Sequence, residues 1–424
     1  MAVSRPWWER DADVCWHPYT QHGIEEPLLP VRGAKGAWLE LADGRRVLDA
    51  VSSWWACLHG HGHPRLVEAL TTQAAQLDHV LFAGCTPEPA VTLAERLVAK
   101  APGALTRAFF SDDGSTAVEV ALKACHAAAL RRGESARGRI VALEGGYHGD
   151  TFGAMAVGDP DPFFREFGDL LFDVVRAPAD PAALEDVMEE HGSSVAAVIL
   201  EPIVQGAAGM RPVSPAVVQA ARRASDAHGA YLVADEVMTG FGRTGTLFAC
   251  EQAGVAPDAM CLSKGLTGGM MPLAVTLFTE AIFDAFRSDD RGRMFFHGHT
   301  YTGHPIGCAV ALASLDVAEA EDTPARFASI GRRIEAGLKA LVPPGPDLAR
   351  RRFGGIVAVE LGGAGGYLAE AGPRLRAAAR ELARDVLLRP LGNVLYAMPP
   401  ACTTEAECDL VAERMADVVA AVRR

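Results

Sequence analysis

Between residues 61 and 315, apolar residues follow two alternating patterns. Short, nearly continuous apolar runs alternate with longer stretches whose apolar residues recur with the period of a helix. The runs predicted as strands are Arg107–Ser111, Arg139–Leu143, Ala196–Glu201, Ala230–Asp235, Ala259–Leu262 and Leu273–Phe278. Helical patterns such as Ser115–Arg131 and Pro215–His228 lie between them. Strands that are apolar on both faces and separated by helices predict an α/β fold with a mostly parallel sheet covered on both sides.

The pattern changes after about residue 315. The predicted helices there are Thr323–Leu341 and Gly372–Leu387, and the predicted strands are Gly355–Leu361 and Val394–Ala397. Two short strands near the start of the chain, Ala37–Leu41 and Arg46–Asp49, fit poorly into a parallel sheet. We therefore predict a large domain over residues 61–315 and a smaller α+β domain built from residues 1–60 and 316–424.

Composition and charge narrow the class of protein. The formal net charge is −13, whereas nucleic-acid-binding domains are usually basic, so nucleic acid is not an expected partner. No apolar run reaches about 18 residues, so no membrane span is expected. The first residues, MAVSRPWWERDADV, lack the apolar core of a secretory signal, and the nine cysteines are scattered without a C-x-x-C pair. These features predict a cytoplasmic protein with reduced thiols.

Two residues at predicted strand ends carry side chains suited to chemistry. Lys264 follows the apolar strand Ala259–Leu262 and precedes Gly265, whereas the other four lysines lie in a glycine turn, at a helix end or inside helices. A lysine there can be partly desolvated, which lowers its pKa toward nucleophilic use; a solvated loop lysine is the alternative. Asp235 ends a buried strand, where open parallel sheets bind ligands, and it can pair with a cation such as a pyridinium nitrogen. A helix cap and a metal ligand are the alternatives for this aspartate.

Two further strand ends offer binding groups. After the first predicted strand of the sheet, Gly114 and Ser115 open a helix whose free amides can bind an anion. A capping box between Thr116 and Glu119 is the plainer interpretation, and both can hold. Tyr147, in the glycine-rich loop after the next strand, can stack on a flat cofactor or simply pack in its loop. A phosphate anchor, a stacking ring, an acid for a ring nitrogen and a Schiff-base lysine together predict a pyridoxal-phosphate site.

Two other motifs suggest different chemistry, and we reject both. Gly240–Gly245 spells G-x-G-x-x-G, but the strand before it ends in two acidic residues that would repel a pyrophosphate, and only a short helix follows. Nicotinamide binding is therefore not expected. The histidines form two groups: His59, His61 and His63, and His297, His299 and His304. Glycines interrupt the first group and no cysteine or acid completes a zinc set, so no metal site is predicted.

Longer motifs give the chain a resemblance to a known family. They are WHPYTQ (Trp16–Gln21), DGRRVLDAVSSWWACLHGHGHP (Asp43–Pro64), GYHGDTFGAM (Gly146–Met155), EPIVQGAAGM (Glu201–Met210), ADEVMTGFGRTG (Ala234–Gly245), SKGLTGG (Ser263–Gly269), HGHTYTGHP (His297–Pro305) and RPLGNVLYAMPP (Arg389–Pro400). With them the chain resembles the class III (ω-) aminotransferases of fold type I over nearly its whole length. The HPYT and SSWWA segments resemble the branch of that family that works in biotin biosynthesis. The resemblance implies amino transfer from S-adenosylmethionine to 8-amino-7-oxononanoate, giving 7,8-diaminononanoate, by a ping-pong mechanism with pyridoxal 5′-phosphate.

The resemblance also assigns roles to single residues. Lys264 would form the Schiff base with the cofactor and move the proton between Cα and C4′. Asp235 would pair with the pyridinium nitrogen, and Tyr147 would stack on the ring. Gly114 and Ser115 would bind the phosphate. Lys264, Asp235 and Tyr147 are thus the expected catalytic group.

Substrate contacts and a partner subunit follow from the same resemblance. Thr300 would reach the phosphate site of the neighbouring subunit, which implies a homodimer with shared active sites. Arg389 would bind a substrate carboxylate through two parallel hydrogen bonds. The expected substrate-pocket residues are Tyr19, Trp54, Trp55, Tyr147, Gly298 and Arg389.

The chain departs from the family pattern at three places. His299 stands where proline is common, and Met271–Pro272 differs from some relatives just after the lysine segment. Ala207 stands where many glutamate-using relatives carry a glutamate, which argues against ornithine- or GABA-type activity. Two alternatives stay open: a lysine-dependent version of the same reaction, and an ω-aminotransferase acting on a diamine or a β-amino acid. A cofactor-binding regulator without activity would have to lack a reacting group, and none is missing.

Overall fold

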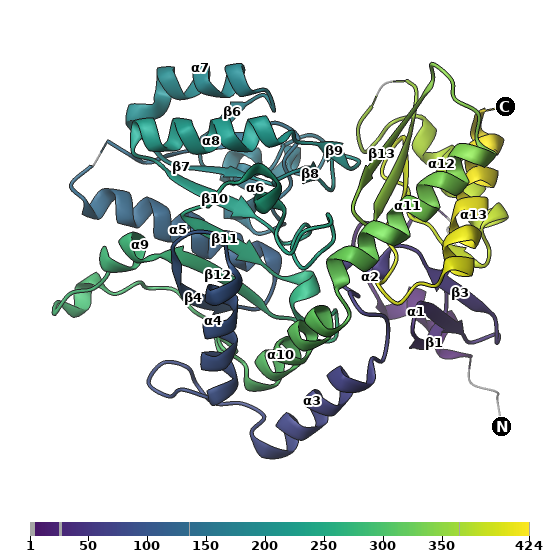
Figure 1. Ribbon diagram of the computed structural model, residues 1–424, viewed down its shortest axis with the longest axis horizontal. Helices are drawn as coiled ribbons and strands as arrows, with labels where there is room; N and C mark the ends of the chain where they lie inside the picture. Colours follow the sequence, from purple (N-terminus) through teal and green to yellow (C-terminus); the bar gives the residue numbers. More distant parts are fainter. Residues whose placement is uncertain (1–4, 25–27, 135, 364, 424) are drawn as a thin grey trace.

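The computed structural model describes residues 5–24, 28–134, 136–363 and 365–423. Figure 1 shows a large α/β body beside a smaller body that combines early and late parts of the chain. The large body is built on a seven-stranded sheet with the order β4-β12-β11-β10-β7-β5-β6. Its strands are β4 (Leu105–Ser111), β5 (Arg139–Leu143), β6 (Val174–Ala177), β7 (Val195–Leu200), β10 (Tyr231–Asp235), β11 (Ala259–Leu262) and β12 (Ala274–Thr279). Within the described residues, no helix is both long enough and apolar enough to cross a membrane.

The sheet is mostly parallel, as predicted, with one exception. β12 runs antiparallel to both of its neighbours, β11 and β4. Only residues 263–273 connect β11 to β12, and a parallel crossover usually needs a helix of its own, which this segment is too short to hold. Because β4 runs antiparallel to β12, it shares the direction of β11. The carboxyl ends of β4, β5, β7, β10 and β11 therefore lie along one edge of the sheet.

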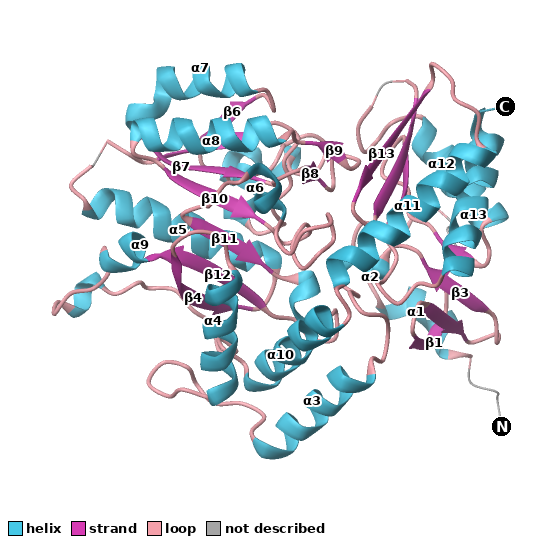
Figure 2. Cartoon of the chain, viewed as in Figure 1, coloured by secondary structure: helices cyan, strands magenta, loops and turns pink. Residues whose placement is uncertain are grey.

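Helices cover both faces of this sheet (Figure 2). Successive strand residues point to opposite faces, and both sets are apolar, so both faces need a covering layer. α5 (Gly114–Arg131) packs on one face, where Ala142 is buried among its alanines and valines. α8 (Pro215–His228) packs on the other, where Val141 is buried. Both faces are therefore closed to water, which explains the nearly continuous apolar runs in the sequence.

Shorter elements connect these layers. The remaining helices between residues 64 and 320 are α3 (Pro64–Gln76), α4 (Glu88–Lys100), α6 (Phe152–Val157), α7 (Pro181–His191), α9 (Glu280–Asp284) and α10 (Pro305–Ala320). The 3-10 turns are η1 (Arg165–Leu170), η2 (Gly192–Ser194), η3 (Ala249–Ala253), η4 (Lys264–Thr267) and η5 (Arg291–Arg293), and a small hairpin pairs β8 (Val204–Gln205) with β9 (Arg211–Pro212).

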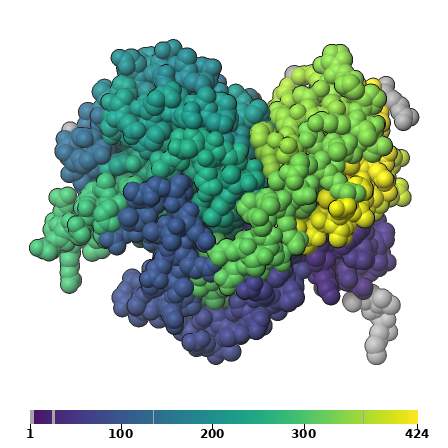
Figure 3. Space-filling model, viewed as in Figure 1, coloured from purple at the N-terminus to yellow at the C-terminus, as the bar shows by residue number. Residues whose placement is uncertain are grey.

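Segments from both ends of the chain build the smaller body. One sheet contains β1 (Val31–Lys35), β2 (Trp38–Leu41), β3 (Arg46–Asp49) and β15 (Val386–Leu387), and another contains β13 (Leu348–Phe353), β14 (Ile356–Leu361) and β16 (Val394–Ala397). The helices are α1 (Trp7–Val14), α2 (Ser52–Trp55), α11 (Thr323–Leu341), α12 (Ala371–Leu382) and α13 (Glu405–Arg423). β3 pairs in parallel with β15, with Leu48 opposite Val386. Figure 3 shows the purple N-terminal segment lying against the yellow C-terminal segment.

Three local features differ from the sequence-based prediction. The helix predicted over Gly372–Leu387 ends at Leu382, because β15 pairs with β3 instead of continuing the helix. Lys35 is the last residue of β1 rather than part of a turn, and the turn begins at Gly36, whose φ is +58°. β13 has the sequence LARRRF and no clear apolar pattern, and it forms the edge of its sheet, where such polarity is tolerated.

Candidate active site

A cavity of about 420 Å³ opens at the edge where the parallel strands end. The loops that follow β4, β5, β7, β10 and β11 line it, which is the usual ligand position in an open parallel sheet. Six of the predicted site residues line this cavity: Trp55, Gly114, Ser115, Tyr147, Asp235 and Lys264. The structure therefore brings the four candidate groups of the sequence, which lie far apart along the chain, into one space.

Lys264 differs from the other lysines in its surroundings. Its Nζ lies 5.0 Å from the centre of the Trp55 ring. Among the described residues it forms no ion pair, whereas Nζ of Lys100 lies 2.8 Å from a glutamate carboxylate. Burial lowers the pKa of Lys264, although the carboxylates of Asp235 and Glu201 act in the opposite direction. A lowered pKa increases the share of neutral amine, the nucleophilic form of lysine.

A buried histidine holds Asp235, and the sequence interpretation did not single it out. Nδ1 of His148 donates to Oδ2 of Asp235 at 2.6 Å, and the backbone N–H of Val237 donates to Oδ1 at 3.1 Å. His148 directly follows Tyr147 in the loop after β5, and its Nε2 has no hydrogen-bond partner among the described residues. Its place in the same strand-end loop as Tyr147 is the signal that could have identified it.

A second acid, Glu201, follows β7 and lines the same cavity. Its two carboxylate oxygens accept hydrogen bonds from the backbone N–H groups of Tyr147 at 3.1 Å and Gly206 at 2.9 Å. Burial raises the pKa of Glu201 to about 7, with His148 opposing the rise and Asp235 adding to it. A buried acid with a pKa near neutrality in a cavity is typical of a functional site. The sequence places Glu201 at a strand end, but gives no sign of this shift.

The amino end of α5 opens into the cavity with a cap that differs from the prediction. Asp113 is the N-cap: its Oδ1 accepts from the backbone N–H of Thr116 at 2.9 Å, and the Thr116 hydroxyl accepts from the Asp113 N–H at 3.1 Å. The predicted capping box between Thr116 and Glu119 is wrong. Glu119 instead accepts from the Thr151 hydroxyl and the Gly153 N–H, each at 2.7 Å, so its carboxylate is committed to another loop.

Two glycines let the backbone close around this helix start. A Cβ on Gly114 would lie 2.6 Å from a methyl carbon of Val237, and a Cβ on Gly149 would lie 1.9 Å from Oγ of Ser115. The Ser115 hydroxyl accepts from the Asp150 N–H at 3.1 Å, which leaves its own proton free to donate. Helix-start amides, a serine hydroxyl, a lysine and a buried carboxylate fit an organic phosphate that carries an aldehyde and a cationic ring.

Aromatic rings connect this cavity to an arginine. The hydroxyls of Tyr19 and Tyr147 donate to Oδ1 of Asp150 at 2.6 and 3.0 Å. Burial raises the pKa of both phenols, so both stay protonated at neutral pH. Trp54 lies edge-on to Tyr19 with ring centres 5.5 Å apart, and the guanidinium of Arg389 lies 4.3 Å from the centre of the Trp54 ring. Four of the six expected substrate residues, Tyr147, Tyr19, Trp54 and Arg389, thus form a continuous row that ends in a cation.

The two expected tryptophans lie in α2, which is a single strained turn of left-handed backbone and not a regular α-helix. Ser52, Ser53, Trp54 and Trp55 all have positive φ, between 45° and 76°. This left-handed conformation costs residues other than glycine roughly 1–2 kcal/mol each, so the surrounding structure must hold it. Sequence patterns give no sign of it, because neither glycine nor asparagine occurs in SSWW.

Five predicted residues do not line the cavity: Tyr19, Trp54 and Arg389 form the row described above, and Gly298 and Thr300 lie in another segment. Gly298 and Thr300 are exposed in the segment between η5 and α10. Nε2 of the neighbouring His299 lies 3.7 Å from Oδ1 of Asp112, two residues before the start of α5. The expected contribution of Thr300 to a partner's phosphate site involves a second chain and stays a prediction.

The rejected motifs occupy other structural positions. Residues 240–245 form turns after β10, and no phosphate-binding strand-to-helix loop follows. The first group of histidines contacts three separate partners: His59 with Ser314 at 3.0 Å, His61 with Asp49 at 2.9 Å and His63 with Glu321 at 3.8 Å. Their spacing therefore does not bring them onto one common ligand.

Comparison with known proteins places the chain in a family. Residues 19–419 match the model of the aminotransferase class-III family. The chain belongs to this family. Over 95% of its length it is 48% identical to the adenosylmethionine-8-amino-7-oxononanoate aminotransferase of Synechococcus elongatus, and it covers 98% of that protein.

Solved structures agree with this class-III assignment. A crystal structure of adenosylmethionine-8-amino-7-oxononanoate aminotransferase from Methanocaldococcus jannaschii is similar with a TM-score of 0.91 and 34% identity, over 98% of both chains. A PLP-bound amine transaminase from an uncultivated Pseudomonas species has a TM-score of 0.89 and 32% identity, over 96% of this chain and 98% of its own. The aminotransferase therefore has fold type I and depends on pyridoxal 5′-phosphate, which confirms the predicted fold class, reaction class and cofactor. The roles of single residues stay predictions.

Proposed function

We propose that this aminotransferase transfers an amino group from S-adenosylmethionine to the C7 ketone of 8-amino-7-oxononanoate, giving 7,8-diaminononanoate for biotin synthesis. The names of its relatives from Synechococcus elongatus and Methanocaldococcus jannaschii support this assignment. The observation that carries it in the structure is the placement of opposite charges at the two ends of an aromatic row.

That placement matches the chemistry of the acceptor. The oxononanoate has an ammonium beside its reacting ketone and a carboxylate at the far end of an alkyl chain. Asp150, which accepts from Tyr19 and Tyr147, offers a carboxylate beside the cavity. Arg389 offers a guanidinium beyond Trp54. An anion and a cation separated by aromatic surface suit a substrate with an ammonium, an alkyl chain and a carboxylate.

The residues of the cavity support the steps of transamination. Pyridoxal 5′-phosphate, when bound, carries the amino group between the two substrates and withdraws electrons through its ring. Lys264 holds the cofactor through Nζ, removes the proton from the donor's α-carbon and, in the second half-reaction, delivers one to C7 of the acceptor. Asp235 keeps a proton on the ring nitrogen, and His148 fixes the orientation of that carboxylate. Gly114 and Ser115 bind the phosphate.

A second chain completes the proposal. We infer a homodimer in which Thr300 of the partner subunit reaches the phosphate and the partner's Gly298 borders the pocket. Tyr147 lies against one face of the cofactor ring. All nine cysteines are unpaired, which supports a location in the reducing cytoplasm.

One assay separates this proposal from its rivals. The purified protein receives 8-amino-7-oxononanoate with S-adenosylmethionine, lysine, glutamate or a diamine in separate reactions, and diaminononanoate is measured. Turnover with S-adenosylmethionine supports the proposal, whereas turnover with lysine alone assigns a different donor. Failure to aminate the oxononanoate with any donor would overturn the assignment. Lys264→Ala is the negative control, because it keeps the phosphate and ring contacts but loses the proton-transfer group.

A further inference from the structure

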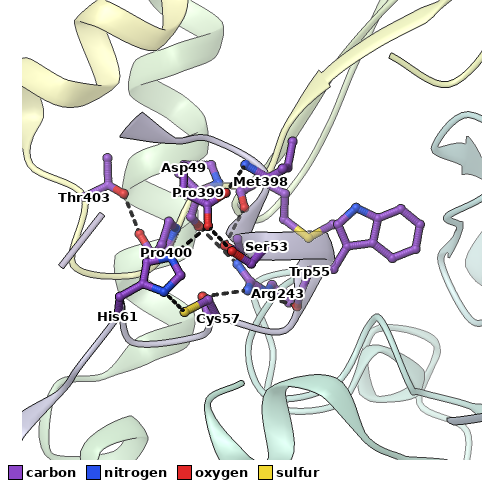
Figure 4. A network of polar contacts seen from close by, with 12 residues as sticks. Asp49, Ser53, Trp55, Cys57, His61, Arg243, Met398, Pro399, Pro400 and Thr403 are labelled. Atoms are coloured by element: carbon purple, nitrogen blue, oxygen red, sulfur yellow. Dashed lines mark hydrogen bonds and ion pairs between the residues drawn. The ribbon is translucent and has the colours of Figure 1, made fainter. Parts of the chain in front are cut away.

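The turn Ser52–Trp55 decides where two substrate-facing rings lie. Its four residues have positive φ without any glycine, so the turn does not favour this shape by itself. Figure 4 shows the indole of Trp55 pointing away from a polar network that surrounds the turn. The Trp55 ring faces Nζ of Lys264 at 5.0 Å, and the Trp54 ring faces Arg389 at 4.3 Å. The Trp55 indole N–H also donates to the Tyr396 hydroxyl at 2.9 Å, so relaxation of the turn would chiefly move the Trp54 ring relative to Arg389.

Asp49 binds the beginning of the turn. Its buried carboxylate accepts from the Ser53 hydroxyl at 2.7 Å, from the Val51 N–H at 3.3 Å and from Nε2 of His61 at 2.9 Å. The hydrogen bond to Asp49, with a second contact to Cys57, raises the pKa of His61 to about 10. Burial alone would raise the pKa of Asp49, but its hydrogen bonds lower it. Both groups are therefore charged at neutral pH and form a partly buried ion pair beside the turn.

Arg243 binds the end of the turn. Its buried guanidinium donates to the carbonyl oxygens of Trp55 and Cys57, each at 3.2 Å, and of Pro399 at 3.1 Å. The arginine comes from the loop after β10 of the large body, whereas Pro399 follows β16 of the smaller body. Figure 4 shows how these contacts converge around the backbone of the turn. A planar guanidinium that donates to three carbonyl oxygens links the turn to both the large and the smaller body.

We propose that Asp49, His61 and Arg243 are positioning residues that hold the Ser52–Trp55 turn in its left-handed shape and so set the substrate-facing geometry of the Trp54 indole. None of the three is among the residues that line the cavity. Their influence on the substrate therefore passes through Trp54. The choice of substrate for the test rests on the proposed function, but the positioning role itself does not.

A double-mutant cycle tests this role in the holoenzyme. His61→Ala removes the cation, His61→Gln keeps a donor for Asp49, and His63→Gln is the matched control, because His63 lies on the same segment and faces Glu321. Each variant is made in the wild-type and Trp54→Ala backgrounds, and kcat and KM for 8-amino-7-oxononanoate are measured. His61→Ala should raise KM roughly tenfold, with a smaller effect on kcat, in the wild-type background and less than about twofold with Trp54→Ala, as expected for coupled residues.

The glutamine variant should restore most of the wild-type KM, and the control should leave it unchanged. An equal rise in KM in both backgrounds would show that His61 does not act through Trp54 and would overturn the proposal. Ser53→Ala serves if His61→Ala does not fold, because it removes one hydrogen bond to Asp49 and leaves the ion pair in place. Ser53→Ala should also raise KM in the wild-type background and less with Trp54→Ala, but by a smaller factor than His61→Ala.

A second measurement needs no substrate. Near-ultraviolet circular dichroism reports the orientation of tryptophan rings, so His61→Ala and Ser53→Ala should alter the tryptophan bands. The alteration should shrink when Trp54 and Trp55 are replaced by phenylalanine. A lower thermal midpoint with unchanged tryptophan bands and unchanged KM would make the network merely structural and defeat the proposal. If the wild-type enzyme does not aminate the oxononanoate, the proposed function fails, whereas the dichroism still decides the positioning role.

Discussion

Replacing Arg389 by alanine tests the most specific contact of the proposed substrate complex. The guanidinium is half-buried and lies over the ring of Trp54 at 4.3 Å. Alanine removes both the positive charge and this stacking contact, so one substrate cannot separate the two effects. The methyl ester of 8-amino-7-oxononanoate separates them, because it keeps the shape of the substrate and lacks the negative charge.

The expected loss of kcat/KM follows from the attraction between the guanidinium and the substrate carboxylate near the protein surface. Two unit charges about 4 Å apart near a protein surface, at an effective dielectric constant of about 20, attract by about 4 kcal/mol. Desolvation and ordering of the pair remove part of this, which leaves roughly 2–3 kcal/mol. Because each 1.36 kcal/mol is a factor of ten, Arg389→Ala should lower kcat/KM for the acid by roughly 30- to 160-fold.

The assay compares acid and ester in wild-type and variant enzymes. The wild-type enzyme should prefer the acid, and Arg389→Ala should treat the two substrates nearly alike. Arg389→Lys should recover only part of the preference, because an ammonium cannot present the planar fork of two donors. Arg384→Ala, at an exposed arginine on the same segment, is the control. An unchanged ratio of acid to ester in Arg389→Ala would refute the carboxylate contact, whatever happens to the absolute rates.

Three other predictions concern the cavity. Burial raises the folded-state pKa of Glu201 to about 7, above its ordinary 4.5, so the folded protein binds this proton more tightly than the unfolded chain does. This proton therefore contributes fully to the free energy of unfolding below pH 4.5, and its contribution is lost as the pH rises to 7. Urea titrations across this range should show the wild-type free energy of unfolding falling relative to Glu201→Gln by up to about 3 kcal/mol, and parallel curves would contradict the raised pKa. Gly149→Ala should weaken cofactor binding by roughly tenfold or more, measured by absorbance titration, because its Cβ would lie 1.9 Å from Oγ of Ser115 and its φ is +125°; unchanged affinity would exclude a tight phosphate cradle. Co-refolded Lys264→Ala and Thr300→Ala chains should regain up to about half of wild-type activity per hybrid dimer, and no gain from a clearly defective Thr300→Ala would exclude shared sites.

Local pattern is enough to predict much of the large body. A strand buried on both faces must be apolar at every position, so β5, β7 and β11 stand out in the sequence. Residues at or just after the ends of such strands share one edge of a parallel sheet, and for that reason the sequence alone groups Lys264, Asp235 and Tyr147. The antiparallel direction of β12 was missed, although the short connection between the predicted strands Ala259–Leu262 and Leu273–Phe278 is a sequence signal for it.

Tertiary structure decides the contacts between distant segments. The bond from His148 to Asp235 and the raised pKa of Glu201 arise only when the loops after β5, β7 and β10 meet. Long-range pairing also explains why the helix predicted to reach Leu387 ends earlier: β15 pairs with β3, and this pairing outweighs the local helical pattern.

The left-handed turn at Ser52–Trp55 shows most clearly what the local sequence cannot predict. Its local sequence disfavours the conformation, and contacts that form only in the folded chain, with Arg243, Tyr396 and Met398, surround it. The sequence by itself therefore determines which segments become strands and helices and which reactive side chains follow them, because burial imposes a period on apolar residues. The choice of hydrogen-bond and ion-pair partners is made only in the folded chain, because those partners lie far apart in the sequence and no local period links them.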